Sequence, residues 1–354
     1  MNLVGKNAPR EFLPALESAR GIAAFMVVIF HFSMAPSPLS EIRNLSRSFY
    51  LAVDFFFILS GFILAKNYLG KIPTKKLFCE FLILRLGRIY PLHLFWLIIY
   101  LLTFLIIQRG HLSSDQIHSL WPTITLTNST FLLGKHTNFN PPSWSISAEW
   151  ISYCVFGLHM LFFESIKKSL NLLFSAILVI VSYFTLFLFY PKHGLNVTYE
   201  AGFLRGIGGF YLGFLGFYIH SKYPAHLKGY LKWITLFIAI FLLINNPKTY
   251  SDFLLPPLAL ILVIWLSGSN AQKSFLTNPF FVWIGTISYS VYLGHDFIGR
   301  FTHQIYTKLL DSPMGGYHLY FLLVIKIVFC YFVAHLTYKF IEKPYRDKVR
   351  ALVK

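Results

Sequence analysis

Arginine and histidine stand at the two ends of one apolar run, RGIAAFMVVIFHF, residues 20–32. An α-helix turns by about 100° per residue, so Arg20 and His31 point to within roughly 20° of the same face. At a rise of about 1.5 Å per residue they lie about 16 Å apart along the helix. We expect a guanidinium and an imidazole at two depths of one polar cavity. The alternative is that Arg20 reaches the cytoplasmic boundary while His31 caps the outer end of the helix.

A second stretch, FCEFLILRLGRIYP at residues 78–91, holds two arginines three residues apart. This spacing makes Arg85 and Arg88 neighbours on a helix surface. Paired guanidiniums suit bidentate contacts with phosphate. Positive-inside anchoring is the alternative, and it explains Lys75 and Lys76 better than an arginine pair against a membrane edge. The pair therefore predicts a site for a phosphate-bearing ligand.

A carboxylate follows in NPPSWSISAEWISY, residues 140–153. Pro141 and Pro142 end a loop, and Glu149 then lies one or two turns into the next apolar helix. A carboxylate inside a membrane needs a partner. We expect Glu149 to hold His31, since a carboxylate is a common way to orient an imidazole that acts as a general base. Purely structural pairing of the two groups is the alternative.

Four further side chains are candidates for the cavity wall or for stabilising an oxyanion. Ser60 interrupts the aromatic run VDFFFILSGFILA, and Tyr153 follows Glu149 by one turn. Arg205 lies within AGFLRGIGGFYLGFLGF, whose glycines recur every three or four residues and predict a close helix–helix seam. His295 lies in ISYSVYLGHDF, where packing within an aromatic core is the alternative.

Composition sets the class of protein that must position these groups. The chain has 354 residues, of which 56% are hydrophobic and only 13% charged. Soluble domains carry about twice that charged fraction. Because the apolar excess recurs along the whole chain, it predicts an all-α, polytopic membrane protein. The net charge of +17 then reflects topology and not nucleic-acid binding. The three cysteines lie far apart without CxxC spacing, so we expect no metal site.

About ten apolar stretches are long enough to cross a bilayer. They lie at residues 13–34, 49–69, 89–108, 144–164, 169–190, 201–221, 229–245, 252–267, 280–303 and 318–341. Residues 120–134 are too short and polar to span and are expected to be interfacial or re-entrant. With both termini cytoplasmic, roughly three quarters of the loop Lys and Arg fall on the inner side. We expect a single domain over residues 1–354, with no fused soluble domain.

These motifs, in this order, resemble the membrane acyltransferase-3 family of integral-membrane O-acyltransferases. LESARGIAAFMVVIFHF is similar to its first-span Arg…His signature, DFFFILSGFILA to its FFxxSGF block and RLGRIYP to its RxxR motif. PPSWSISAEWISY, LRGIGGFYLGFLGF, ISYSVYLGH and FIEKPYR resemble its later motifs. Departures are small: Ile146 replaces a usual Leu, and Lys343 interrupts a family-typical ERP.

The resemblance implies ten transmembrane helices, an acyl-CoA donor (usually acetyl-CoA) and a hydroxyl acceptor on a sugar. His31 matches the family's essential histidine, Arg20 its first-span arginine, and Arg85 and Arg88 its RxxR pair. Some members carry a C-terminal esterase-like domain that completes the transfer. Since this chain ends just after EKPYR, we expect it to perform the whole reaction or to pass the group to a separate partner.

The expected function is acyl transfer at a bacterial inner membrane. Acetyl-CoA binds at the cytoplasmic face through Arg20, Arg85 and Arg88. The acceptor is a cell-surface glycan, lipopolysaccharide O-antigen or exopolysaccharide, which can be lipid-linked. The alternative is a transporter or flippase of a lipid-linked glycan. That class commonly shows inverted repeats, and the sequence shows no such internal symmetry.

Overall fold

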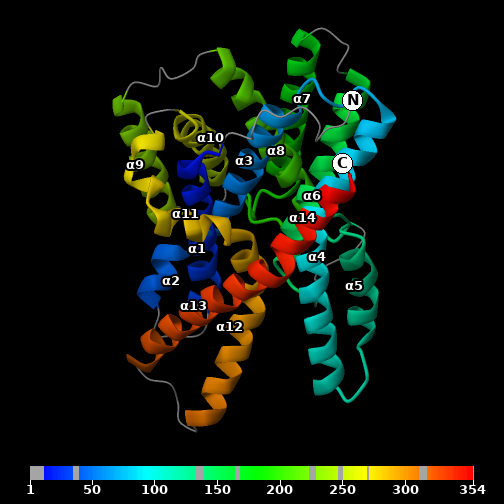
Figure 1. The fold of residues 1–354 in the computed structure, drawn as a ribbon. Helices are drawn as coiled ribbons and strands as arrows, with labels where there is room; N and C mark the ends of the chain where they lie inside the picture. The colour runs from blue at the N-terminus through cyan, green and yellow to red at the C-terminus, as the bar shows by residue number, and fades with distance from the viewer. Residues whose placement is uncertain are drawn as a thin grey trace.

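The computed structural model describes residues 12–34, 40–131, 139–163, 168–222, 229–245, 250–268, 271–310 and 317–353. These residues form helices and no strands, which confirms the all-α prediction (Figure 1). The helices are α1 (Pro14–Ser33), α2 (Ser40–Ser46), α3 (Ala52–Tyr68), α4 (Lys75–Ile107), α5 (Ser114–Ile124), α6 (Ser143–Phe163), α7 (Lys168–Phe189), α8 (Gly202–Lys222), α9 (Gly229–Asn245), α10 (Leu255–Leu266), α11 (Pro279–Thr286), α12 (Ser288–Leu310), α13 (Tyr317–Thr337) and α14 (Lys343–Leu352).

Seven helical segments among the described residues are long and apolar enough to cross a membrane. They are Pro14–Ser33, Ser40–Tyr68, Lys75–Ile107, Ser143–Phe163, Lys168–Phe189, Gly202–Lys222 and His318–Leu352. Two shorter apolar helices, Trp233–Asn245 and Ser251–Leu266, coincide with two more predicted spans. The remaining predicted span, 280–303, is broken at Ile287 into α11 and α12. The chain is therefore a multi-pass, all-helical protein.

Helix α4 is longer than the predicted span 89–108. It begins at Lys75, where the Thr74 side chain accepts a hydrogen bond from the Leu77 N–H at 3.3 Å. It then passes through Pro91 to Ile107 without interruption, although Pro91 provides no N–H for the helix. The arginines of RLGRIYP consequently lie near the middle of a 33-residue helix and not at the entrance of a span.

The expected interfacial segment begins earlier in the chain than predicted. Ser113 and Gln116 form a reciprocal capping box that starts α5 at Ser114, and this short helix ends at Ile124. It lies beside the C-terminal half of α4 (Figure 1). Residues 132–134 of the predicted segment are outside the described residues.

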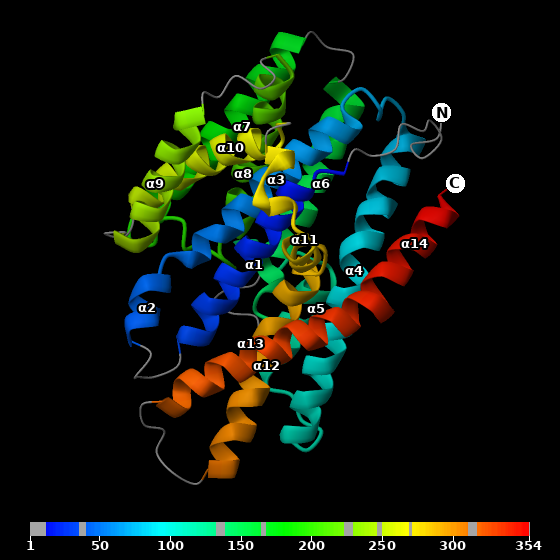
Figure 2. The same cartoon turned by 60° about the vertical axis from the view of Figure 1, so that its left-hand side comes forward.

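Helix α1 runs through the bundle against α3, α11 and α12, which brings its polar face toward the other functional helices. Toward the other end of the chain, α13 continues through a π-helical turn, Tyr338–Glu342, directly into α14. Figure 2 shows α13 and α14 as one rod that crosses α4. The C-terminal helix thus returns to the part of α4 that holds the arginine pair.

The predicted glycine seam is the contact between α8 and α3. A Cβ atom on Gly213 would lie 1.9 Å from the Ile58 carbonyl oxygen, and one on Gly61 would lie 1.8 Å from the Phe210 carbonyl oxygen. No side chain fits at either position unless the helices separate. The sequence-based reading of these glycines as a close-packing seam is therefore confirmed.

Arg205 belongs to this packing and does not line the pocket described below, contrary to expectation. It is 1% exposed, as is Asp54. The guanidinium donates from Nε to Asp54 Oδ1 at 3.0 Å and from Nη2 to Asp54 Oδ2 at 2.6 Å. It also donates to the Tyr50 carbonyl oxygen at 3.2 Å and lies 5.1 Å from the Trp144 ring. The buried charge is satisfied by its partner on α3, so it ties α8 to α3.

Gly213→Ala should destabilise the protein, because the new methyl group meets backbone that cannot rotate away. Overpacking of this kind costs about 1–3 kcal/mol or more. The measurement is thermal unfolding of the detergent-solubilised protein. Gly208→Ala is the control on the same helix, since its Cβ would meet only side-chain atoms, at 3.2 Å. Equal melting temperatures for the two variants would contradict the seam.

Arg205→Met should destabilise the protein by about 3–5 kcal/mol, because it leaves Asp54 as an uncompensated buried charge. The same unfolding measurement applies. Adding Asp54→Leu should restore part of the loss. Arg300→Met is the control, since Arg300 pairs with Asp296 but its side chain is 64% exposed. A double variant no more stable than Arg205→Met would argue against the pairing.

Candidate active site

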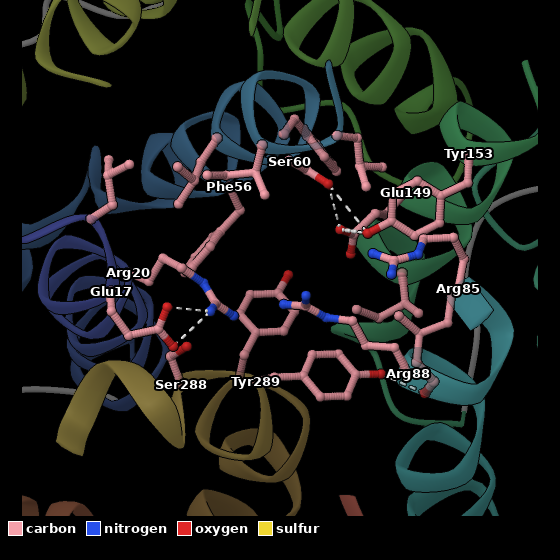
Figure 3. Close-up of a pocket in the computed structure, with 18 of the residues that line it drawn as sticks. Glu17, Arg20, Phe56, Ser60, Arg85, Arg88, Glu149, Tyr153, Ser288 and Tyr289 are labelled. Atoms are coloured by element: carbon pink, nitrogen blue, oxygen red, sulfur yellow. Dashed lines mark hydrogen bonds and ion pairs between the residues drawn. The ribbon is translucent and has the colours of Figure 1, made fainter. Parts of the chain in front are cut away.

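A pocket of about 430 Å³ opens between α1, α3, α4, α6, α12 and the C-terminal helices. Six of the nine predicted site residues line it: Arg20, Ser60, Arg85, Arg88, Glu149 and Tyr153. Its other charged or hydroxyl-bearing lining residues are Glu17, Lys66, Tyr68, Ser145, Thr286, Ser288, Tyr289, Tyr292, Tyr338, Glu342, Arg346 and Arg350. Residues from opposite ends of the chain thus meet in one polar site within an apolar bundle (Figure 3).

Arg20 is held on the α1 side of the pocket by the carboxylate one turn earlier. Its Nη1 atom donates to both oxygens of Glu17, at 2.9 and 3.0 Å. Both side chains are about one fifth exposed, at 19% and 22%. The pair therefore places a guanidinium on the pocket wall while its charge is partly neutralised.

The two arginines of α4 have different environments. Arg85 is 5% exposed, donates from Nη2 to Tyr68 OH at 3.2 Å and lies 5.4 Å from the centre of that ring. Arg88 is half-buried and extends into the middle of the pocket (Figure 3). Within the described part of the chain, Arg88 forms no hydrogen bond or ion pair. Arg88 thus extends into the pocket, while Arg85 lines its wall with a buried Nε atom that has no hydrogen-bond partner among the described residues.

Three carboxylates surround Arg88 without contacting it directly. The charges of Glu17, Glu149 and Glu342 all act on its guanidinium. These groups come from α1, α6 and the π-helical turn. Their field holds the cation in the low-dielectric bundle while its hydrogen-bond donors stay available.

Glu149 is engaged by hydroxyl groups and not by His31, which corrects the predicted pairing. Its Oε1 accepts a hydrogen bond from Ser60 Oγ at 3.0 Å and a short one from Tyr153 OH. The Ser60 Oγ and Tyr153 OH atoms lie 3.2 Å apart. Because both hydroxyl protons point at the carboxylate, the structure gives no support to these groups as donors to an oxyanion. The contacts instead anchor the carboxylate beside Arg88.

His31 contacts another histidine and does not line the pocket, contrary to the expectation that it shares one cavity with Arg20. Its Nδ1 lies 3.0 Å from the Val27 carbonyl oxygen and 3.2 Å from His295 Nε2. His295 Nδ1 lies 2.6 Å from the Tyr292 carbonyl oxygen. His31 is exposed and His295 is fully buried. His295, expected at the cavity wall, therefore lies behind His31 as its direct partner.

The two backbone carbonyls determine which nitrogens carry protons. A carbonyl oxygen only accepts, so Nδ1 of each imidazole must be protonated to satisfy its contact. In a neutral His295 the Nε2 atom then has a lone pair and accepts from the Nδ1–H of His31. The remaining nitrogen, His31 Nε2, is unprotonated. The arrangement gives His31 the form required of a general base.

Tyr292 connects the histidine pair to the pocket. Its ring lines the pocket, where it packs edge-on against Phe56 at 6.0 Å, and its carbonyl oxygen holds His295. The rings of Tyr292 and His295 lie 5.8 Å apart. The imidazoles are thus one helical turn along α12 from the pocket wall.

Sequence reasoning missed several residues of the site, and four of them come from the C-terminal motifs ISYSVYLGH and FIEKPYR and the residues that follow. Tyr289 lines the pocket and donates to the Ile89 carbonyl oxygen at 2.6 Å. Glu342, Arg346 and Arg350 line it from the C-terminal rod. Their spacing of four residues in FIEKPYRDKVR was the available signal. Within the described residues, no cluster of three His, Cys, Asp or Glu side chains is arranged to hold a metal ion.

Curated relatives of this chain include proteins of Staphylococcus aureus. A protein named "Putative O-acetyltransferase" from strain COL is 24% identical over 374 aligned positions, which cover 96% of this chain and 58% of the relative. The O-acetyltransferase OatA of strain NCTC 8325 is 25% identical with the same coverage. This chain therefore spans little more than half the length of these relatives. No solved structure matches it.

The family comparison agrees with the resemblance seen in the motifs. The family model described as an acyltransferase domain matches residues 13–335, which include α1 to α13 almost completely. The matched region holds Arg20, His31, Arg88 and Glu149. The chain belongs to the acyltransferase-3 family.

Proposed function

We propose that this protein transfers an acetyl group from acetyl-CoA to a hydroxyl group of a cell-surface glycan. The observation that carries the proposal is the layout of α1, which presents Arg20 to a cationic pocket and, farther along, holds His31 by its Nδ1 atom against Val27 and His295, so that Nε2 is left to act as a base. Family membership and relatives named as O-acetyltransferases support acyl transfer to oxygen. Lipopolysaccharide O-antigen and exopolysaccharide are the acceptors we propose, either of which can be lipid-linked.

The donor enters the pocket with its phosphates against guanidinium groups. Arg88 and Arg20 supply planar, permanently charged donors that suit phosphate oxygens. The axial distance of about 16 Å from Arg20 to His31 is one that the extended pantetheine arm can bridge. In a ten-span arrangement with both termini cytoplasmic, at a bacterial inner membrane, the pocket faces the cytoplasm, where acyl-CoA is made.

The chemistry then takes place at His31. Its Nε2 takes the proton from the acceptor hydroxyl as that oxygen attacks the thioester carbonyl carbon. The carbon–oxygen bond forms, the carbon–sulfur bond breaks, and the proton passes from the imidazolium to the departing CoA thiolate. His295 accepts the Nδ1–H of His31 and so keeps the ring oriented while it is charged. Transient acylation of His31 would use the same nitrogen.

Glu149 has a different role in this proposal from the one the sequence suggested. Through Ser60 and Tyr153 it is fixed beside Arg88, and its charge acts on that guanidinium. It therefore positions the phosphate-binding cation and does not orient the base.

His31→Ala should abolish acetyl transfer, a loss of at least about 100-fold, because it removes the proton acceptor. The measurement is the acetyl content of surface glycan, by mass spectrometry, in a deletion strain complemented with each variant. Immunoblots of the membrane fraction check that the variant is inserted and abundant. His335→Ala is the control, an exposed histidine that contacts Trp283 on the outside of the bundle. Unchanged acetylation with His31→Ala would exclude His31 as the base.

His295→Phe should lower kcat for transfer while the KM for acetyl-CoA stays the same, since His295 contacts the base and not the pocket. His295→Gln should recover part of the rate, because its side-chain oxygen can accept the His31 Nδ1–H. Initial rates with radiolabelled acetyl-CoA and glycan from the deletion strain measure both constants. If His295 had only a structural role, kcat would fall equally in the two variants. That result would refute the proposal that His295 positions His31.

A further inference from the structure

The C-terminal rod turns one face toward the pocket. Tyr338, Glu342, Arg346 and Arg350 recur every fourth residue, and all four line the pocket wall. Lys343 and Lys348, between them, are exposed. Residues four apart share a helix face, so α14 presents two guanidiniums to the pocket and its lysines to the outside. These two arginines have no role in the chemistry described above.

A close contact fixes this helix against the RLGR segment. A Cβ atom on Gly87 would lie 2.6 Å from Val349 Cγ1, so the absence of a side chain at Gly87 lets α14 approach α4. Gly87 directly precedes Arg88. Both views place α14 alongside α4 (Figures 1 and 2). The same turn of α4 that extends Arg88 into the pocket thus carries the helix that holds Arg346 and Arg350.

Arg346 is incompletely paired. Its Nη1 lies 3.9 Å from Glu342 Oε1 and its Nε lies 3.8 Å from Asp347 Oδ1, both beyond hydrogen-bond distance. Its buried Nε finds no hydrogen-bond partner in the part of the chain that the structure describes. The Glu342 carboxylate is occupied by Ser290, which donates to Oε2 at 2.7 Å. The Nη groups of Arg346, which make no hydrogen bond within that part of the chain, are the donors available to an anion in the pocket.

The exposure of the side chains gives the order of the cations. Arg350 is 43% exposed and Arg346 is 23% exposed, while Arg88 lies deeper, surrounded by carboxylates. The acyl end of the donor must reach His31, so the nucleotide end of CoA remains nearest the exposed end of the pocket. The charge on that end, apart from the diphosphate, is the phosphate on the ribose 3′-oxygen.

We propose that Arg346 and Arg350 of α14 bind the 3′-phosphate of acyl-CoA, while Arg88 and Arg20 bind the diphosphate. This inference rests on the proposed function, because it assumes a CoA thioester as donor. The C-terminal helix is therefore the element that distinguishes CoA from donors that lack this phosphate. All of α14 lies beyond residue 335, where the family match ends.

The test is calorimetric binding of CoA and of 3′-dephospho-CoA to the purified, detergent-solubilised full chain. The unchanged protein should prefer CoA. Arg350→Gln and Arg346→Gln should each weaken CoA binding about tenfold, which corresponds to about 1.4 kcal/mol, and leave 3′-dephospho-CoA binding nearly unchanged. Lys348→Gln makes the same charge change on the exposed face of α14 and should alter neither affinity.

The outcomes separate the two proposals. The 3′-phosphate site is refuted if both arginine variants bind CoA as tightly as the unchanged protein does. It is also refuted if each variant loses affinity for CoA and for 3′-dephospho-CoA equally. In both cases acetyl-CoA stands as the proposed donor. If the unchanged protein binds neither ligand, the donor assignment fails and the 3′-phosphate site fails with it.

A second pair of variants tests the helix without altering its charge. Gly87→Ala should reproduce the loss of preference for CoA by displacing α14. Val349→Ala in the same chain should restore part of it, because it removes the two Cγ atoms that the new methyl group meets and leaves only Cβ. A Gly87→Ala variant with full preference for CoA would show that the position of α14 does not matter.

Discussion

The site depends on the imbalance of charge inside an apolar bundle. Six cationic side chains line the pocket against three carboxylates. Burying a charge without compensation costs several kcal/mol, so the three carboxylates are required for the cations to stay in the bundle at all. They do not neutralise the set, and Arg88 makes no direct contact with any of them. The protein thus folds with a positive potential that a polyanionic ligand is suited to complete.

Arg205 and Arg88 illustrate two uses of a buried guanidinium. Arg205 donates hydrogen bonds to both carboxylate oxygens of Asp54, and the Trp144 ring covers its guanidinium. Its hydrogen bonds therefore stabilise the packing of α3 against α8. Arg88 is kept in place by a field and by the anchored Glu149, and its donors are not used by the described residues. The proposed ligand site thus lies where the pairing is incomplete, while the completely paired Arg205 belongs to the packing of two helices.

What the sequence could predict was whatever depends on one helix. The glycine seam and most helix positions follow from periodicity and small residues alone, whereas the cavity expected for both Arg20 and His31 is lined only by Arg20 of the two. Side-chain partners on different helices could not be predicted, because a similar depth in the membrane does not define how each helix is rotated about its axis. Glu149 contacts Ser60, and His31 contacts His295. The pairing of Arg205 with Asp54 joins residues 151 positions apart. Arg346 and Arg350 were missed because their direction depends on a π-helical turn and on the Gly87 contact.

The uninterrupted passage from α13 through the π-helical turn into α14 has a mechanical consequence. On α13, Lys326 lies over the Phe32 ring at 5.9 Å, and Phe32 lies 6.4 Å from His295. On α14, Arg346 and Arg350 lie at the pocket. One continuous rod therefore contacts the neighbourhood of the imidazoles through α13 and lines the pocket through α14. A tilt of this rod cannot alter one end alone.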